Sequence, residues 1–127
     1  DAFGCPDGLW TDARGVLWIQ TDMSTSAMGK GDLARLGNNM MLAADVATGE
    51  TRRFLVGPAG CEVTGVVMTP DLTTVFVDIQ HPGESPSERA DPDRPKAISS
   101  WPDGPSGGRP RSATIVVRRR DGGIVGS

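Results

Sequence analysis

Two acidic residues follow the same short motif at separate places in the chain. Asp7 lies in FGCPDGLW and Glu62 lies in GCEVTG, so each follows a Gly-Cys pair and precedes a strand-like segment. If the two strands lie next to each other around a shared central channel, their two carboxylates point into it. Such a pair would suit a hard cation such as Ca²⁺, which takes several oxygen ligands. Pro-Asp-Gly is also a common turn, so a turn role stays open for Asp7. Glu62 lacks such a context, which favours a metal-ligand role.

Other residues of the chain could take part in catalysis or binding. His81 is the single histidine and stands at a predicted strand end in IQHPGE, where a catalytic, ligand or simply exposed role is open. Asn39 opens a predicted strand, and its amide could bind a metal or the backbone. Arg109 and Arg111 flank Pro110, and the fork of a guanidinium group suits phosphate oxygens. His81 and Arg111 are therefore the catalytic candidates.

The overall composition excludes several classes of protein and site. A net charge of −3 argues against a nucleic-acid partner, and no stretch approaches the roughly 18 apolar residues of a membrane span. The basic run at residues 118–120 is interpreted as a solvated strand end. No Gly-rich phosphate loop, paired-His zinc motif or Gly-x-Ser-x-Gly elbow is present. Cys5 and Cys61 could form a disulfide or remain free thiols.

Turn residues and short apolar runs predict an all-β protein. The chain contains 17 Gly and 10 Pro, which fits many short strands joined by tight turns. Most of the predicted strands are four to six residues long, and the segments alternate with Gly-, Asp- or Pro-containing turns. The predicted strands are residues 8–11, 16–21, 39–44, 51–56, 65–68, 74–79, 113–117 and 124–125.

An internal repeat divides the predicted strands into two units. GLWTDARGVLWIQ aligns with GVVMTPDLTTVFVDI at an offset of roughly 57 residues, after the shared Gly-Cys pair. The pattern predicts two four-stranded antiparallel propeller-type blades, residues 1–58 and 59–127, the second with a long inserted loop at about 80–111. A β-sandwich could use eight strands as well, but it would not need a repeated loop motif.

The segments FGCPDGLWTDARGVLWIQTD, GNNMMLAADVATGETRRFLVGPAGCEVTGVVMTPD, VDIQHPGE, WPDG and RPRSATIVV together resemble the C-terminal part of PhoX-type alkaline phosphatases. The resemblance implies a fragment of a six-bladed β-propeller and a parent enzyme that releases phosphate from small organic phosphate esters. It also implies Ca²⁺ and Fe³⁺ cofactors, and bacterial export by the twin-arginine pathway to the periplasm or outside. By the same resemblance, Asp7 and Glu62 ligate calcium, and Trp10 and Asn39 lie near the channel, with Trp10 close to substrate.

The extent of the chain leads to a second set of expectations. It starts at Asp1 without Met and carries two predicted blades, so we expect a segment whose partners are the remaining blades of a parent chain. Such a segment is expected to be inactive alone and to self-associate through its uncovered flanks, and whether it binds metal alone is open. The alternatives are a non-catalytic binding or structural module and a Ca²⁺-dependent, lactonase-like propeller hydrolase.

Overall fold

The computed structural model describes residues 1–87 and 91–127 and confirms an all-β chain. The described residues form seven strands and one 3-10 helix, η1 (Gly31–Leu33). The strands are β1 (Pro6–Thr11), β2 (Val16–Thr21), β3 (Met40–Asp45), β4 (Thr51–Val56), β5 (Glu62–Met68), β6 (Thr74–Gln80) and β7 (Ala113–Arg118). None of the described helical structure is long and apolar enough to cross a lipid bilayer.

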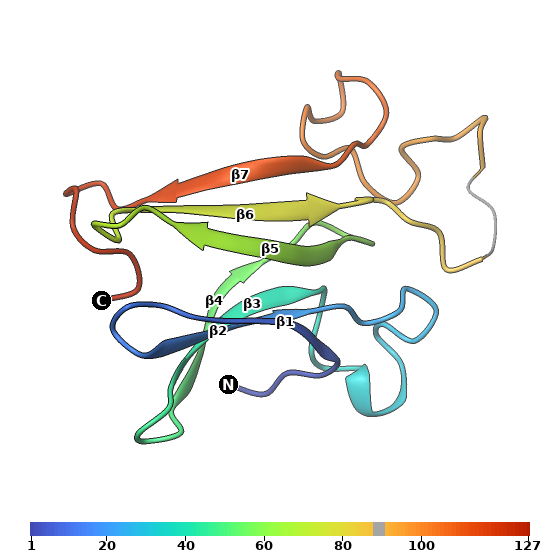
Figure 1. Ribbon diagram of the computed structural model, residues 1–127. Helices are drawn as coiled ribbons and strands as arrows, with labels where there is room; N and C mark the ends of the chain where they lie inside the picture. The colour runs from blue at the N-terminus through green and yellow to red at the C-terminus, as the bar shows by residue number, and fades with distance from the viewer. Residues whose placement is uncertain (88–90) are drawn as a thin grey trace.

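The strands form two antiparallel sheets in chain order. The first sheet has the order β1-β2-β3-β4, and the second has the order β5-β6-β7. In Figure 1 the two sheets lie one over the other, and β4 leads into β5 at their junction. Because neighbours in each sheet are consecutive in sequence, each sheet is an antiparallel meander.

Short polar side chains close the tight turns of these meanders. At the β3–β4 turn, Asp45 Oδ1 accepts from the backbone N–H groups of Ala47 and Thr48, and Gly49 has a φ of 75°. At the β5–β6 turn, Asp71 Oδ1 accepts from Thr69 Oγ1 and Thr73 N. These side chains satisfy the backbone locally, as is typical of Asx turns.

The first sheet has the four strands predicted for it, but the second lacks the fourth strand predicted at residues 124–125, so the prediction of a second four-stranded unit is wrong for the described chain. After β7, Arg119 pairs with Asp121 and Gly122 has a φ of 74°, which turns the chain away from the sheet. Val125 then donates its N–H to Leu72 O at 3.0 Å rather than pairing with β7. The apolar side chain of Val125 is buried between the sheets, which explains the strand-like pattern of the sequence there.

The main core lies between the two sheets. Trp18 and Met41 from the first sheet pack with Val63, Val75 and Val77 from the second. The ring of Phe54 meets the Trp18 ring edge-on, with 4.9 Å between the ring centroids.

A smaller core covers the opposite face of the first sheet. There the N-terminal segment and the β2–β3 connection cover Ile19, Met40 and Leu42, with Leu33 and Leu36 packed against them. The first sheet is therefore covered on both faces.

Candidate functional site

The first strand of each sheet carries a bulge, and a buried glutamine joins the two bulges. The pairing register shifts between Pro6 and Leu9 in β1 and between Thr64 and Val66 in β5. Gln20 is 2% exposed; its Nε2 donates to Gly8 O and its Oε1 accepts from Val66 N, both at 3.2 Å, in the amide orientation that satisfies both atoms. The bulges therefore fix how the two strands meet.

Asp7 lies within the bulge of β1 and is exposed. The sequence placed it before the strand, whereas β1 begins one residue earlier, at Pro6. An exposed carboxylate on a bulge is free to reach a ligand, and its predicted role in metal binding stays a prediction.

Glu62 begins β5, and its carboxylate is held against the end of β6. It pairs in register with Gln80, whose Nε2 donates to Glu62 Oε2 at 2.7 Å. His81 Nε2 lies 3.5 Å from the same oxygen. Glu62 is 9% exposed, and no Lys or Arg of the described residues pairs with it. His81 is thus the one basic partner of Glu62 among the described residues. Burying a charged carboxylate costs free energy unless a cation compensates its charge.

The turn that carries His81 is attached to the loop before β5. Gly83 N donates to Ala59 O at 2.8 Å, and Glu84 N donates to Gly60 O at 3.1 Å. The Cα of Gly60 lies so close to Glu84 that an added Cβ would come within 2.9 Å of the Glu84 backbone nitrogen. This close approach fixes the turn beside Glu62.

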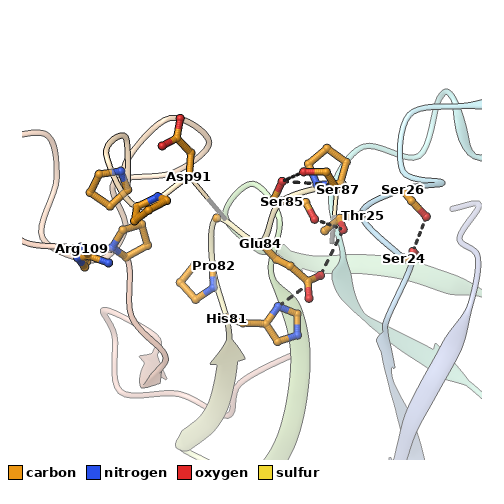
Figure 2. A pocket seen from close by; sticks show the side chains of 15 residues that line it. Ser24, Thr25, Ser26, His81, Pro82, Glu84, Ser85, Ser87, Asp91 and Arg109 are labelled. Atoms are coloured by element: carbon orange, nitrogen blue, oxygen red, sulfur yellow. Dashed lines mark hydrogen bonds and ion pairs between the residues drawn. The ribbon is translucent and has the colours of Figure 1, made fainter. Parts of the chain in front are cut away.

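An open pocket of about 700 Å³ begins on the other side of His81. Figure 2 shows His81 and Glu84 pointing toward one another, with Nδ1 3.8 Å from Glu84 Oε2. Thr25, from the β2–β3 connection, donates to Glu84 Oε2 at 3.3 Å and so joins the loops of the two sheets. His81 Nδ1 is buried and has no hydrogen-bond partner in the described part of the chain. His81 therefore separates Glu62 from the pocket.

The two arginines around Pro110 differ in their surroundings. Arg109 lines the pocket and makes no hydrogen bond or ion pair with the described residues. Arg111, the arginine singled out from the sequence, pairs with Asp103 at 3.0 Å on the exposed loop surface instead. The geometry favours Arg109 for contact with an anion, while the catalytic role predicted for Arg111 stays a prediction.

Asn39 is 1% exposed, and both atoms of its amide are in use. Its Oδ1 accepts from Thr21 Oγ1 and Met23 N, and its Nδ2 donates to Met23 O and to Cys61 O, the latter at 2.8 Å. These four bonds use the hydrogen-bonding capacity of the amide. The arrangement favours an anchoring role over the ligand role predicted from the sequence.

Trp10 is half-buried and packs against the core between the sheets. This packing accounts for its place in β1, and its predicted closeness to substrate stays a prediction.

Both cysteines are free thiols. Cys5 is exposed with a φ of 52°, whereas Cys61 is fully buried. Burial, with smaller contributions from the negative charges of Glu62 and Asp22, raises the pKa of the Cys61 thiol to about 12. Cys61 therefore behaves as an apolar core residue at neutral pH.

No group of three or more His, Cys, Asp or Glu side chains in residues 1–87 and 91–127 is arranged to hold a metal ion. Any metal held by Glu62 would therefore need ligands from outside this part of the chain.

The comparisons with known proteins relate this arrangement to one family. The family model described as alkaline phosphatase PhoX matches residues 1–83. The chain belongs to the PhoX alkaline phosphatase family. A solved structure of Pseudomonas fluorescens PhoX in complex with vanadate, a transition-state analogue, is 51% identical, with a TM-score of 0.79 over 95% of this chain. No curated protein sequence matches the chain.

The chain spans 19% of the length of the Pseudomonas fluorescens PhoX chain. Most of that PhoX chain therefore lies outside the part that this chain matches.

The sequence predicted Glu62 and His81 as candidate site residues but not the residues that contact them. Gln80 and Thr25 were not predicted, because glutamine and threonine are not residue types that indicate a catalytic site. Their roles depend on strand register and loop contact. The signal available was the position of Gln80, which lies next to His81 in IQHPGE and near the end of a predicted strand.

Proposed function

We propose that this chain is part of a metal-dependent phosphomonoesterase of the PhoX type, which releases phosphate from small organic phosphate esters. The observation that carries the proposal is the 51% identity to a PhoX chain solved with a transition-state analogue. Vanadate mimics a phosphoryl group during transfer, so the relative's site accommodates that geometry. In this chain, the residues around Glu62 and His81 form one wall of the corresponding site.

The remaining residues of the active site come from the rest of the parent chain. We propose that the parent is a six-bladed β-propeller in which the two sheets are adjacent blades, so the isolated segment is inactive. Two observations support this arrangement of blades: the chain covers 19% of the relative, and the outer face of the β5–β7 sheet is apolar and exposed. On that face Val67, Phe76 and Val116 pair in register as an apolar stripe, and Val67 and Val116 are more than half exposed. A neighbouring blade would cover it.

Glu62 fits a hard cation by its surroundings. Its described polar contacts all involve Oε2, which leaves Oε1 without a protein partner. A largely buried carboxylate with one free oxygen suits Ca²⁺, and Asp7 on the neighbouring innermost strand is the second candidate ligand. We propose these two as the contribution of this chain to a site that holds Ca²⁺, with Fe³⁺ held by residues elsewhere in the parent.

The chemistry assigned to this chain is binding and orientation. When bound, the cations would neutralise charge on the phosphoryl oxygens and the leaving group. Glu62 holds its place through Gln80, and His81, on the pocket wall, is the candidate for proton exchange with the substrate's leaving oxygen. Arg109, which pairs with none of the described residues, offers its guanidinium to an anionic ester.

The family resemblance further supports an exported bacterial parent. We propose export through the twin-arginine pathway to the periplasm or the medium, after the metal site has formed in the folded protein. Retention of the phosphatase inside cells that lack this pathway is the expected result.

The test is phosphatase activity of the full-length protein with Ca²⁺ and Fe³⁺. Wild type should release phosphate from p-nitrophenyl phosphate, and Glu62→Gln should lower kcat at least roughly 100-fold. The control is Glu50→Gln, which removes an exposed carboxylate paired with Arg52 and should leave the rate unchanged. A protein that hydrolyses lactones with Ca²⁺ and releases no phosphate, or that does neither, would contradict the proposal.

A further inference from the structure

The carboxylate of Glu62 is fixed by a neutral donor. Gln80 lies opposite Glu62 in the β5–β6 register, and its Nε2 reaches Oε2 at 2.7 Å. A lysine or arginine at this place would orient the carboxylate but also neutralise it. An amide donates a hydrogen bond and keeps the full negative charge available.

The backbone before Glu62 is fixed separately. Asn39 Nδ2 donates to Cys61 O, the carbonyl of the peptide bond that joins Cys61 to Glu62. Because Asn39 is also bonded to Met23 and Thr21, this carbonyl is tied to the connection between β2 and β3. Asn39 thus anchors the backbone and Gln80 holds one carboxylate oxygen, whereas none of the described residues hydrogen-bonds to the other oxygen.

We propose that Gln80 is a positioning residue that orients Glu62, holding Oε2 so that Oε1 is directed to a cation. The proposal rests on the proposed function, since it takes Glu62 as the ligand. Residues that hydrogen-bond to a ligating carboxylate fix its orientation, and their loss typically weakens metal binding by 10- to 100-fold. Gln80 itself does not touch the metal or the substrate.

The test uses the full-length protein and Ca²⁺ alone as the probe. Gln80→Met removes the donor at nearly constant length, and Gln80→Ala removes the side chain. Because Gln80 is exposed at a strand end, both variants are expected to fold, which circular dichroism checks. We expect the Ca²⁺ Kd, measured by chelator competition, to rise roughly 10-fold in both, and excess Ca²⁺ to restore kcat.

A matched control is available two residues earlier in β6, at Asp78, which lies on the same face of the sheet as Gln80. Thr114 donates its hydroxyl to Asp78 Oδ1, its partner in register, so Thr114→Val removes a donor from a carboxylate that is not a proposed ligand. This variant should bind Ca²⁺ as wild type does.

The outcomes separate this inference from the proposed function. If Glu62→Gln weakens Ca²⁺ binding but both Gln80 variants bind like wild type, the positioning role is overturned and the proposed function stands. If Glu62→Gln binds Ca²⁺ like wild type, the ligand role of Glu62 fails, and the role of Gln80 with it. Equal weakening by Thr114→Val would show a general effect of the sheet and also overturn the inference.

Discussion

Arg14, in the β1–β2 turn, donates from Nη2 to the carbonyl oxygen of Val125 at 3.0 Å. The bond joins the first hairpin of one sheet to the segment that follows the last strand of the other. Val125 also donates to Leu72 O, and Gly126 lies against the Trp18 ring so closely that an added Cβ would come within 2.8 Å of it. The C-terminal segment thus connects the two sheets.

Shortening Val125 should test that connection. Val125 is 2% exposed, so Val125→Ala is expected to lower the free energy of unfolding by about 2 kcal/mol through lost apolar burial. Urea unfolding of the chain measures it. Ile124→Ala, at the more exposed neighbouring position, should cost less than about 0.5 kcal/mol, and equal losses would contradict a specific role for Val125.

Asp12 should make stability depend on acid pH. Burial acts to raise the pKa of Asp12, but hydrogen bonds from Arg14, Trp18 and Val16 outweigh it and hold the pKa below its ordinary value. A lowered folded-state pKa adds stability above the unfolded pKa of about 4, and this stability is lost as pH falls through the folded-state pKa.

The measurement is urea unfolding of wild type and Asp12→Asn from pH 7 to pH 2. The variant places an amide N–H group toward the Arg14 and Trp18 donors, so it should lose about 3 kcal/mol at pH 7 and decline less steeply in acid. Asp32→Asn, an exposed position on η1, serves as the control. Parallel pH profiles for Asp12→Asn and wild type would contradict the role of Asp12.

Gly60 should be more sensitive to a methyl group than other glycines with positive φ. Its φ is 66°, and an added Cβ would lie 2.8 Å from Glu84 O, whereas Gly104, with a φ of 77°, has nothing within 4 Å of that position. Gly104→Ala should therefore cost about 1 kcal/mol from backbone conformation alone, and Gly60→Ala at least about 2 kcal/mol more.

Unfolding measures both glycine variants, and amide exchange identifies the place of the damage. The Glu84 N–H, bonded to Gly60 O, should exchange faster in Gly60→Ala and remain protected in Gly104→Ala. Equal losses in the free energy of unfolding would show that the contact of Gly60 with the 81–84 turn does not contribute to stability.

The sequence predicted the strands because apolar runs and turn residues are local signals. The Gly-Cys repeat also predicted that Asp7 and Glu62 occupy matching places, and they lie in the first strands of the two sheets. The contacts that define the site are not local. The Glu62–Gln80 bond depends on the β5–β6 register, and the four bonds of Asn39 depend on three segments meeting. The strand predicted at residues 124–125 is wrong because a buried segment and a paired strand both require apolar side chains. Val125 is apolar because it packs in the core with Trp18.

The uncovered face of the second sheet should drive self-association of the isolated chain. Val67, Phe76 and Val116 form a stripe across β5, β6 and β7, and Val67 and Val116 are 56% and 54% exposed. Replacing both valines by threonine keeps the shape and strand preference but adds hydroxyls. Association between copies should weaken at least about 10-fold, since each change removes one apolar group from the interface.

Light scattering over a concentration series measures the association. The matched control is Val46→Thr, because Val46 is 65% exposed but lies in the β3–β4 turn, away from the stripe. It should associate as wild type does. A monomeric wild-type chain at every concentration would contradict the prediction, because the apolar stripe would then be stable in water without a neighbouring sheet.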